Sequence, residues 1–343
     1  MTHFSLTDHL GRVSAGQDLS LADMADVIDH VMRGQCAENQ IALLLTALRA
    51  KGESVDEIAG AAQAMRRHMT PIRHSRKGVV DTCGTGGDGS GTFNISTAAA
   101  IVTAAAGVPV AKHGNRSITS KSGSADVLAE LGINVEAPVP VVERCLEELG
   151  ICFCFAPHLH PSMKHVGPIR KQLGFPTIFN LLGPLCNPAS APFQVLGVGR
   201  PEHKERIAAA LARLGIEHAV VVSGEDGLDE VTLGGTTQAI EIRGHDTSPL
   251  SWQPEDFGLT PAGRETMLIT GPQESAAIIR RVLSGERGPC RDIVILNAAA
   301  ALWTAGREPS PVACAQLAAA AIDSGQAADL LARWAAASHQ TPP

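Results

Sequence analysis

The spacing of apolar residues predicts that roughly the first 70 residues are helical. Apolar side chains recur every three or four positions, as at Leu21, Met24, Ile28 and Val31. The predicted helices span 20–33, 37–50 and 54–68. Ser54 and Glu57 have the spacing of a capping pair, and Pro71 is expected to end the helical block.

From residue 78 the pattern changes to short apolar runs that alternate with helical stretches. The predicted strands are 78–82, 108–112, 133–136, 151–156, 194–198 and 218–223. The predicted helices are 96–106, 124–131, 141–149 and 202–214, followed by 274–283, 291–304 and 311–336. Such alternation is typical of an α/β domain in which helices cover both faces of a mainly parallel sheet.

The segment from 157 to 192 interrupts this alternation. It is rich in Pro, Gly, His and Asn, and we expect an excursion with short helices at 165–173 and 178–182. His158, His160 and His165 lie here, and a His-x-His next to Pro161 more often orders a turn or lines a pocket than binds a transition metal.

The composition of the chain argues against several classes of function. The chain has 35 acidic and 28 basic residues and only 3% aromatic residues, which argues against nucleic acid as a main partner. The N-terminus lacks the pattern of a signal peptide, and the most apolar stretch, 98–111, is too short to cross a membrane. Eight scattered cysteines without a CxxC pair predict reduced thiols and a cytoplasmic location.

The most informative motif runs from Asp81 to Thr97 and reads DTCGTGGDGSGTFNIST. We call residues 83–94 the glycine loop; it joins a predicted strand to a predicted helix. Glycines let backbone N–H groups converge on a ligand oxygen, and the helix N-terminus adds unpaired donors, so the motif predicts phosphate binding. It formally matches a dinucleotide fingerprint, but the next strand ends in the cationic run Lys112–Arg116 instead of the acidic residue that a ribose requires.

A second cluster follows the next predicted strand. It contains Lys112, Asn115 and Arg116, and it continues into a hydroxyl-rich stretch that we call the serine loop, residues 115–124. Because neighbouring parallel strands end at the same edge of a sheet, the two loops are expected to form one anion site there. The alternatives are a purely polar turn and, for Ser124, an N-cap.

The acidic loop, residues 224–230, reads GEDGLDE and follows another predicted strand. Carboxylates at a strand end suit Mg²⁺, which takes oxygen ligands and keeps waters and substrate phosphates in its coordination shell. The alternative is a solvated acidic turn. Two phosphate-binding loops nearby favour the magnesium interpretation.

These motifs together resemble the anthranilate phosphoribosyltransferase family. The resemblance rests on GTGGDGSGTFNIST, KHGNR, SKSGSADVLAELG, HPSMK, GPIRKQLG, TIFNLLGPLCNP and GLDE in this order, and it covers about residues 20–330. It implies the nucleoside-phosphorylase-like phosphoribosyltransferase fold. In that fold a small helical domain, 1–72 completed by an inserted segment at about 163–190, is hinged to an α/β domain, 73–162 and 191–337. It also implies a homodimer.

The resemblance further implies transfer of a phosphoribosyl group from 5-phosphoribosyl 1-pyrophosphate (PRPP) to anthranilate in tryptophan biosynthesis, with two Mg²⁺ ions. The implied PRPP-binding residues are Gly84, Gly87, Asp88, Thr92, Asn94, Ile95, Ser96, Thr97, Lys112, His113, Gly114, Asn115, Arg116, Ser117, Ile118, Thr119, Ser120 and Ser124. The implied anthranilate-binding residues are Gly84, Asn115 and Arg170, and the implied magnesium ligands are Ser96, Asp229 and Glu230. No residue is assigned as nucleophile or general base.

Two positions depart from the family pattern. Leu159 stands where an aromatic residue or His is expected before the His-Pro pair, and Pro176 stands where the family usually has Arg before TIFN. Both lie in the segment that should face anthranilate, so acceptor preference depends on them.

Two other functions use the same fold. A pyrimidine nucleoside phosphorylase would use phosphate and a nucleoside; the Asp229-Glu230 pair and KHGNR argue against it. A non-catalytic relative would bind nucleic acid; the net charge of −7 and the intact motifs argue against that interpretation. A phosphorolysis assay would reveal the phosphorylase. A salt-sensitive mobility shift of labelled single-stranded DNA would reveal the nucleic-acid-binding relative.

Overall fold

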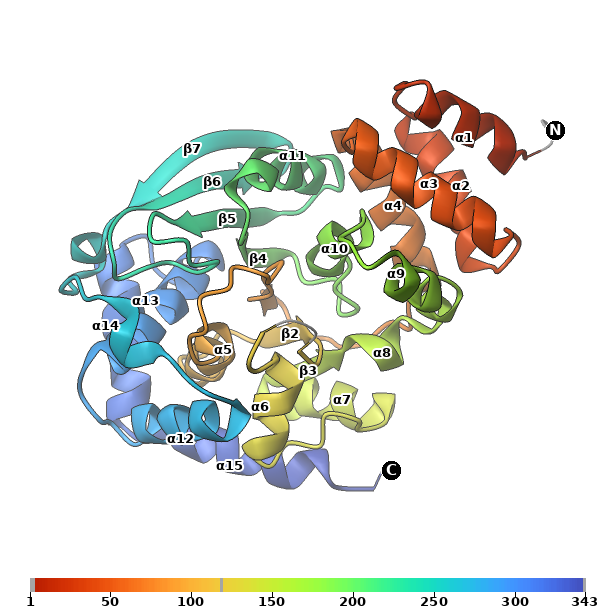
Figure 1. Ribbon diagram of the computed structural model, residues 1–343. Helices are drawn as coiled ribbons and strands as arrows, with labels where there is room; N and C mark the ends of the chain where they lie inside the picture. The colour runs from red at the N-terminus through yellow and green to blue at the C-terminus, as the bar shows by residue number, and fades with distance from the viewer. Residues whose placement is uncertain (1–3, 118–119, 342–343) are drawn as a thin grey trace.

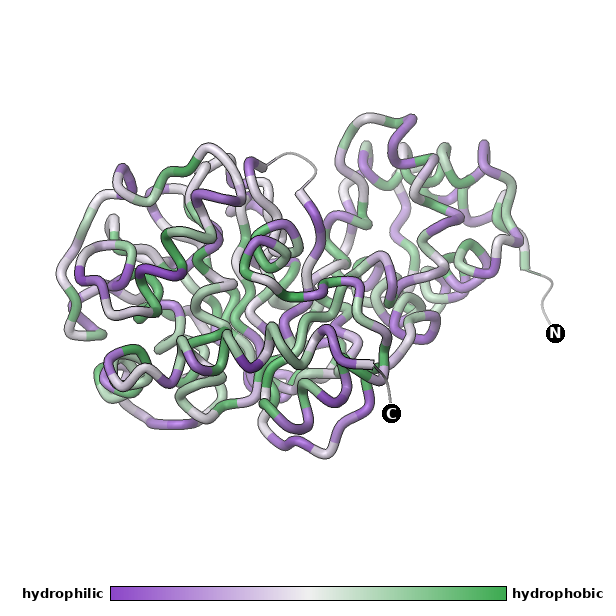
Figure 2. Tube along the Cα trace, turned by 90° about the horizontal axis from the view of Figure 1, so that it is seen from below, coloured by the Kyte–Doolittle hydropathy of each residue, from purple (hydrophilic) through white to green (hydrophobic). Residues whose placement is uncertain are grey.

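The protein is described here by a computed structural model, which covers residues 4–117 and 120–341. The N-terminal part is a bundle of α1 (Leu6–Ser14), α2 (Leu21–Met32), α3 (Glu38–Lys51) and α4 (Val55–His68). The three predicted helices are therefore confirmed, and α1 is an additional one. The bundle forms a lobe at one end of the molecule (Figures 1 and 2).

The capping pair at the start of α4 is also confirmed. The Glu57 backbone N–H donates to Ser54 Oγ at 3.2 Å, and the Ser54 N–H donates to Glu57 Oε2 at 2.8 Å. Lys51 Nζ lies 2.9 Å from the same carboxylate oxygen, and the Leu19 N–H donates to the other. Because the Glu57 side chain is fully buried, these partners compensate its desolvation and tie three segments of the bundle together.

The second part is an α/β domain around a seven-stranded sheet with the order β3-β2-β1-β4-β5-β6-β7. The strands are β1 (Val80–Asp81), β2 (Val110–Gly114), β3 (Ile151–Phe155), β4 (Phe193–Gly197), β5 (His218–Gly224), β6 (Thr237–Arg243) and β7 (Asp246–Trp252). The pairs among β1 to β5 are parallel, whereas β6 and β7 pair in antiparallel fashion. The predicted fold class, a helical domain plus a mainly parallel α/β domain, is confirmed.

Helices surround this sheet (Figure 1). They are α5 (Ile95–Ala105), α6 (Ser124–Glu130), α7 (Val139–Arg144), α8 (Ala156–Leu159), α9 (Gly167–Leu173), α10 (Phe179–Leu182), α11 (Lys204–Arg213), α12 (Pro272–Leu283), α13 (Pro289–Thr304), α14 (Pro311–Asp323) and α15 (Gln326–Ser338). Single turns of other helix types are η1 (Cys145–Leu149), η2 (Pro161–His165), η3 (Gly183–Leu185), η4 (Pro201–His203), η5 (Pro254–Phe257) and η6 (Arg264–Met267).

Alternating side chains of the central strands serve two separate cores. On β5, Val220 and Val222 pack in the core that contains α5 and α13, whereas Ala219 and Val221 pack with α11 and the N-terminal bundle. This is the period-two pattern of a strand buried on both faces. The second core also includes Val166, Ile169, Phe179 and Leu182, so the 161–186 segment packs with the bundle on the same face.

Two predictions about elements were wrong, and one hairpin was missed. Residues 133–136 form a turn, because Ile133 and Val135 bury against neighbouring helices without pairing in the sheet. The predicted helix 311–336 is two helices, divided at Gly325, whose φ of 80° an α-helix cannot accommodate. The hairpin of β6 and β7 was not predicted.

In the described part of the chain, no helix combines the length and apolar character needed to cross a membrane.

Candidate active site

The two predicted anion loops meet at the carboxyl edge of the sheet. β1 and β2 are parallel neighbours, and Lys112 near the end of β2 reaches across to the end of β1. Its Nζ donates to the Thr82 carbonyl at 2.9 Å and lies 3.3 Å from Ser96 Oγ at the start of α5. Lys112 is only 3% exposed, so it places a positive charge directly beneath the site.

Glycine allows the glycine loop to fold tightly against β4 and the acidic loop. Gly86, Gly87, Gly89 and Gly91 have φ values of 65°, 80°, 67° and 68°, a region that other residues rarely adopt. At Gly84 the limit is space, because a Cβ there would lie 3.1 Å from both Asp229 Oδ2 and the Gly197 carbonyl oxygen. The loop can therefore approach the carboxylates only with these glycines in place.

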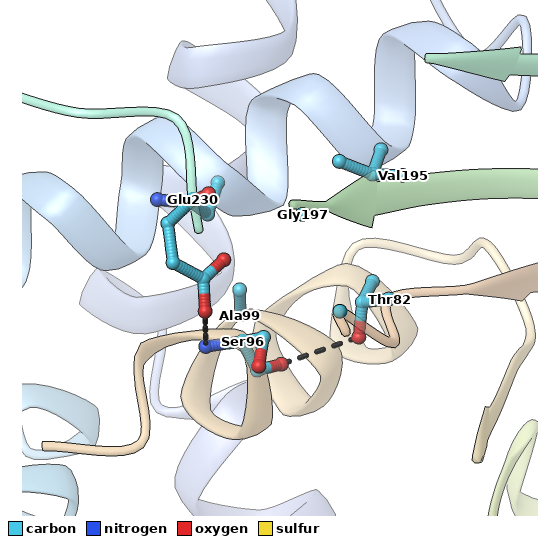
Figure 3. Close-up of a pocket in the computed structure, with 8 residues that line it drawn as sticks. Thr82, Ser96, Ala99, Val195, Gly197 and Glu230 are labelled. Carbon is cyan, nitrogen blue, oxygen red and sulfur yellow. Dashed lines mark hydrogen bonds between the residues drawn. The ribbon is translucent and has the colours of Figure 1, made fainter. Parts of the chain in front are cut away.

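Three carboxylates gather beside this loop. Asp229 Oδ2 accepts the Gly86 N–H at 3.0 Å, and Asp88 Oδ2 accepts the Asp229 N–H at 3.4 Å. Glu230 Oε1 accepts the Ser96 N–H at 3.1 Å in the first turn of α5, as Figure 3 shows. Burial and the negative charge of Asp88 raise the pKa of Asp229 well above its usual range, and burial raises the pKa of Glu230 to about 7.

The arrangement of these groups fits Mg²⁺. Asp229, Glu230 and the Ser96 hydroxyl offer only oxygen atoms, and burial followed by mutual repulsion raises the pKa values of the two carboxyl groups, which a bound divalent cation would counteract. Among the described residues, no group of three or more His, Cys, Asp or Glu side chains is arranged to hold a metal on its own. Such a site would have to be completed by water or substrate oxygens, as is usual for Mg²⁺.

The remaining residues of the glycine loop lie around the start of α5. Thr92 forms an isolated antiparallel bridge with Leu268, and Asn94 is the N-cap residue, with no side-chain bond to the helix. Ile95 and Thr97 are buried in the first turn. The hydroxyl oxygen of Thr97 has no hydrogen-bond partner among the described atoms.

The serine loop is held by hydrogen bonds to its own helix, α6. The Asn115 carbonyl accepts the Ala125 N–H and the Ser124 hydroxyl, at 3.1 and 3.3 Å. Gly123 is the residue at the N-cap position, so the alternative role of Ser124 as N-cap was wrong. Ser117 donates its N–H to Asp126 Oδ2, and its hydroxyl donates to the Ser120 carbonyl. Ile118 and Thr119 lie outside the described residues.

Arg116 forms ion pairs with two acidic residues that follow it in the chain. Its guanidinium lies 2.9 Å from Glu136 and 3.6 Å from Asp126, above the ring of Phe155. Gly114 adjoins it at the end of β2, where a Cβ would collide with Ser124 and Phe153. The structure therefore places Arg116 at the rim of the site.

His113 connects the sheet edge to the irregular segment 157–192. Its Nδ1 lies 3.0 Å from the Gly183 carbonyl, and its Nε2 lies 3.2 Å from Nε2 of His160. Because a carbonyl oxygen only accepts, Nδ1 carries the proton and Nε2 accepts a hydrogen bond from His160. Burial lowers the pKa of His113 to about 3 and that of His160 to about 4, so both rings are neutral. The His160 ring therefore joins two segments that are distant in sequence, a contact that the sequence analysis did not predict.

Arg170, the predicted carboxylate partner, lies on α9. Its Nη2 donates to Asn180 Oδ1 at 3.2 Å, and its guanidinium lies 5.8 Å from the ring centre of Phe179. Burial lowers its pKa. The two atypical positions flank it: the Leu159 carbonyl accepts the Thr70 N–H, and the Pro176 carbonyl accepts from Arg49 Nη1 at 2.8 Å.

Comparison with known proteins agrees with this arrangement. The family model described as "Glycosyl transferase family, a/b domain" matches residues 76–328, and the corresponding helical bundle model matches 7–69. Anthranilate phosphoribosyltransferase from Rhodopirellula baltica is 50% identical over 96% of this chain and 97% of its own. The chain belongs to the anthranilate phosphoribosyltransferase family.

Solved structures support the assignment. The enzyme of this name from Thermus thermophilus is 44% identical, with a TM-score of 0.92 over 97% of this chain and 100% of its own. The enzyme from Saccharomyces cerevisiae, in complex with PRPP and Mg, is 31% identical, with a TM-score of 0.88 over 97% of both chains. The fold and the family expected from the motifs are both confirmed.

Two residues at this site were missed by the sequence analysis. Asn297 on α13 exchanges two hydrogen bonds with the backbone of Val231, both at 2.9 Å, and so holds the chain next to Glu230. A single Asn in the apolar run IVILNAAAAL was a usable signal for it. Ser275 contacts Asn94 from α12, and nothing in its local sequence points to that role.

Proposed function

We propose that this chain transfers the phosphoribosyl group of PRPP to the amino group of anthranilate, giving N-(5-phosphoribosyl)anthranilate and pyrophosphate in tryptophan biosynthesis. The observation that carries this proposal is the meeting of the glycine and serine loops beside the Asp229-Glu230 pair at one sheet edge. Membership of the anthranilate phosphoribosyltransferase family supports the same reaction.

The donor PRPP is assigned to the two loops. The glycine loop and the start of α5 would contribute Gly84, Gly87, Asp88, Thr92, Asn94, Ile95, Ser96 and Thr97, and the following segment would contribute 112–120 and Ser124. Backbone N–H groups at a helix N-terminus favour phosphate oxygens. Lys112 adds positive charge from below, and Arg116 adds it from the rim.

Magnesium is assigned to Ser96, Asp229 and Glu230, and two ions are proposed. When bound, Mg²⁺ would neutralise negative charge on the leaving pyrophosphate. The support lies in these half-buried carboxylates, whose pKa values are raised by burial, and in the yeast structure that contains PRPP and Mg. Asn297 and the Ser96 N–H would hold these carboxylates in place.

Anthranilate is assigned to Gly84, Asn115 and Arg170. Arg170 has the planar fork of donors that pairs with a carboxylate. The amino group would then attack C1 of the ribose as the bond to pyrophosphate breaks. An aryl amine is nucleophilic without a strong base, which agrees with the absence of an assigned general base. Desolvation raises the pKa of Cys83, the thiol nearest the glycine loop, so we assign it no nucleophilic role.

Several further properties are proposed with this function. Packing of the 161–186 segment with the N-terminal bundle supports a helical domain of 1–72 plus about 163–190, hinged to 73–162 and 191–337. Closure at that hinge would exclude water from the donor. A homodimer and a cytoplasmic location are proposed on the family resemblance and on the eight free cysteines, respectively.

A fluorescence assay tests the function directly. The natural fluorescence of anthranilate is followed after PRPP and Mg²⁺ are added, with a chelator in the control. We expect loss of signal only when donor and metal are both present. If the fluorescence did not fall although calorimetry showed that PRPP binds, anthranilate would not be the acceptor. Leu159 and Pro176 would then be the first positions to test for a different acceptor preference. Release of pyrimidine base from a nucleoside with phosphate would support the phosphorylase alternative.

A further inference from the structure

The far end of the glycine loop is bound to a segment distant in sequence, residues 267–275, between η6 and the first turn of α12. The Phe93 N–H donates to the Met267 carbonyl at 2.8 Å, and the Ile269 N–H donates to the Gly91 carbonyl at 3.0 Å. Together with the bridge between Thr92 and Leu268, these bonds form a short antiparallel pairing. The loop is thus restrained at the side opposite the acidic loop.

Ser275 continues this restraint to Asn94. The Asn94 backbone N–H donates to Ser275 Oγ at 3.0 Å, and the same hydroxyl donates to Asn94 Oδ1 at 2.8 Å. Ser275 has no exposed surface, so water does not replace it as a partner. One hydroxyl therefore fixes both the backbone and the side chain of Asn94.

Ser122 of the serine loop holds the same amide from the other side. Its hydroxyl donates to Asn94 Oδ1 at 2.7 Å, and Asn94 Nδ2 donates to the Ser122 carbonyl at 3.1 Å. Next to it, Lys121 Nζ donates to the Ile269 carbonyl at 2.8 Å. The 267–275 segment therefore contacts both loops of the proposed donor site, and Asn94 is the point at which they join.

We propose that Ser275 is a positioning residue for the donor: by orienting Asn94 it sets the spacing of the glycine and serine loops before PRPP binds. This inference rests on the proposed function, because PRPP is the ligand assigned to these loops. Loops that are already ordered lose less conformational entropy on binding, so Ser275 should strengthen donor binding and leave the acceptor unaffected. Ser275 itself need not touch substrate.

The experiment compares Ser275→Ala with the unchanged protein by calorimetry of PRPP with Mg²⁺ and by steady-state kinetics. Loss of the hydroxyl should raise the Kd and the KM for PRPP about tenfold, the usual effect of one buried hydrogen-bonding group. The KM for anthranilate and kcat should stay within about twofold. Ser284→Ala, at the other end of α12, removes a hydroxyl bonded only to the nearby Arg281 carbonyl and should change none of these values.

A double-mutant cycle separates positioning from general loss of structure. In an Asn94→Ala background, the further change Ser275→Ala should raise the Kd for PRPP clearly less than it does in the parent, because the side-chain partner is absent and only the bond from the backbone N–H of residue 94 to Ser275 Oγ remains to be lost. The thiol of Ser275→Cys is similar in size to the hydroxyl but forms a weaker hydrogen bond. The Kd of this variant for PRPP should therefore lie between those of the parent and Ser275→Ala, and it can replace Ser275→Ala in the test if the alanine variant folds poorly.

Three results would overturn the inference. An unchanged Kd for PRPP in Ser275→Ala would do so, as would additive effects in the cycle. An equal rise in the KM for anthranilate would also do so, because it would indicate a general structural effect. A different outcome is that the unchanged protein binds PRPP without consuming anthranilate. In that case anthranilate is not the acceptor, but the comparison of Kd values for PRPP between Ser275→Ala and the unchanged protein still tests the role of Ser275. If the unchanged protein does not bind PRPP, both proposals fall.

Discussion

The proposed donor site and the proposed acceptor site are built in different ways. The donor site consists of loops that directly follow β1, β2 and β5, and its parts are joined by short contacts such as Lys112 to Thr82 and Ser96 to Glu230. Arg170, the residue proposed to bind the acceptor, lies instead on α9, a short helix in an irregular segment. That segment packs against the N-terminal bundle through Val166 and Ile169.

The difference shows what each site depends on. Parallel strands impose the position of the donor loops, because their carboxyl ends share one edge of the sheet. The position of Arg170 depends on packing between segments far apart in the chain, including the bond from Arg49 to the Pro176 carbonyl. Changes in the helical domain should therefore affect anthranilate and spare PRPP, whereas changes at the strand ends should do the reverse.

The largest effect is expected at the acidic loop. Glu230→Gln keeps the shape of the side chain and the hydrogen bond from Ser96 but removes the charge assigned to magnesium. We expect kcat/KM for PRPP to fall about 100-fold or more and the Mg²⁺ concentration for half-maximal activity to rise, measured by the fluorescence assay. Without metal, the thermal midpoint should not fall, because the variant removes a carboxylate whose charged form burial disfavours, while the bond from the Ser96 N–H remains.

Glu225→Gln is the matched control for this variant. Glu225 belongs to the same loop but is exposed and accepts the Thr236 N–H. Its activity and its metal requirement should be unchanged. If Glu225→Gln and Glu230→Gln lost activity equally, the loop would act through its overall charge and the assignment of Glu230 as a ligand would be wrong.

The second prediction concerns pH and the contact between the two sites, where His113 meets His160. Burial lowers the pKa of His160 from 6.5 to about 4, so the unfolded chain binds a proton in this range and the folded chain does not. The stability that this neutral ring contributes is present above pH 6.5 and lost as pH falls towards 4. The free energy of unfolding should fall by about 1.4 kcal/mol per pH unit well below pH 6.5, and by about 3 kcal/mol in total.

Urea unfolding between pH 7 and 4 measures this effect. His160→Gln should reduce the slope and leave the part that the neutral His113 ring contributes, whereas His158→Gln, at an exposed neighbour, should keep the slope of the parent. An identical slope in the parent and His160→Gln would show that other groups cause the acid sensitivity and that this contact does not join the two sites as described.

The same difference explains which parts could be predicted from sequence. The glycine loop, the strand before it and the helix after it were predictable, because glycine spacing, an apolar run and a helix start are local signals. Residues 133–136 have the same kind of apolar run but bury it against helices, and periodicity cannot tell a paired strand from a buried turn. β7 reads DTSPLSW, and its pairing with β6 is visible only once β6 is in place.

Side-chain partners at the site were even less predictable. Asp226 lies in the same acidic loop as Asp229 and Glu230, yet it accepts the Thr232 hydroxyl at 2.6 Å, whereas Asp229 accepts the Gly86 N–H of the glycine loop. Arg116 belongs to KHGNR and is nevertheless bound by Glu136, 20 positions further along the chain. Such choices depend on packing that brings distant residues together, which a local pattern does not contain.

A third prediction tests the acceptor side. Arg170→Ala should raise the KM for anthranilate about 30-fold, since a charge-assisted bond to a carboxylate contributes about 2 kcal/mol, while the Kd for PRPP stays constant. Lys171→Ala removes the exposed positive charge next to it and serves as the control. Fluorescence kinetics at varied anthranilate, with calorimetry of PRPP, separate the two substrates. A rise in the Kd for PRPP that matched the rise in KM would place Arg170 in the donor site.

The smallest effect should come from the N-terminal bundle, which contains none of the proposed substrate-binding residues. Arg49 on α3 donates to the Pro176 carbonyl at 2.8 Å and lies 5.5 Å from the ring centre of Phe175, so it fixes the chain between α9 and α10. Arg49→Ala should raise the KM for anthranilate about threefold, the effect of one exposed hydrogen bond, without changing the Kd for PRPP. Arg12→Ala removes an arginine that pairs with Asp23 inside the same bundle and should leave both values unchanged. Equal behaviour of the two variants would mean that the bundle does not position the acceptor segment through Arg49, and the contrast between the two sites would then rest on Arg170 alone.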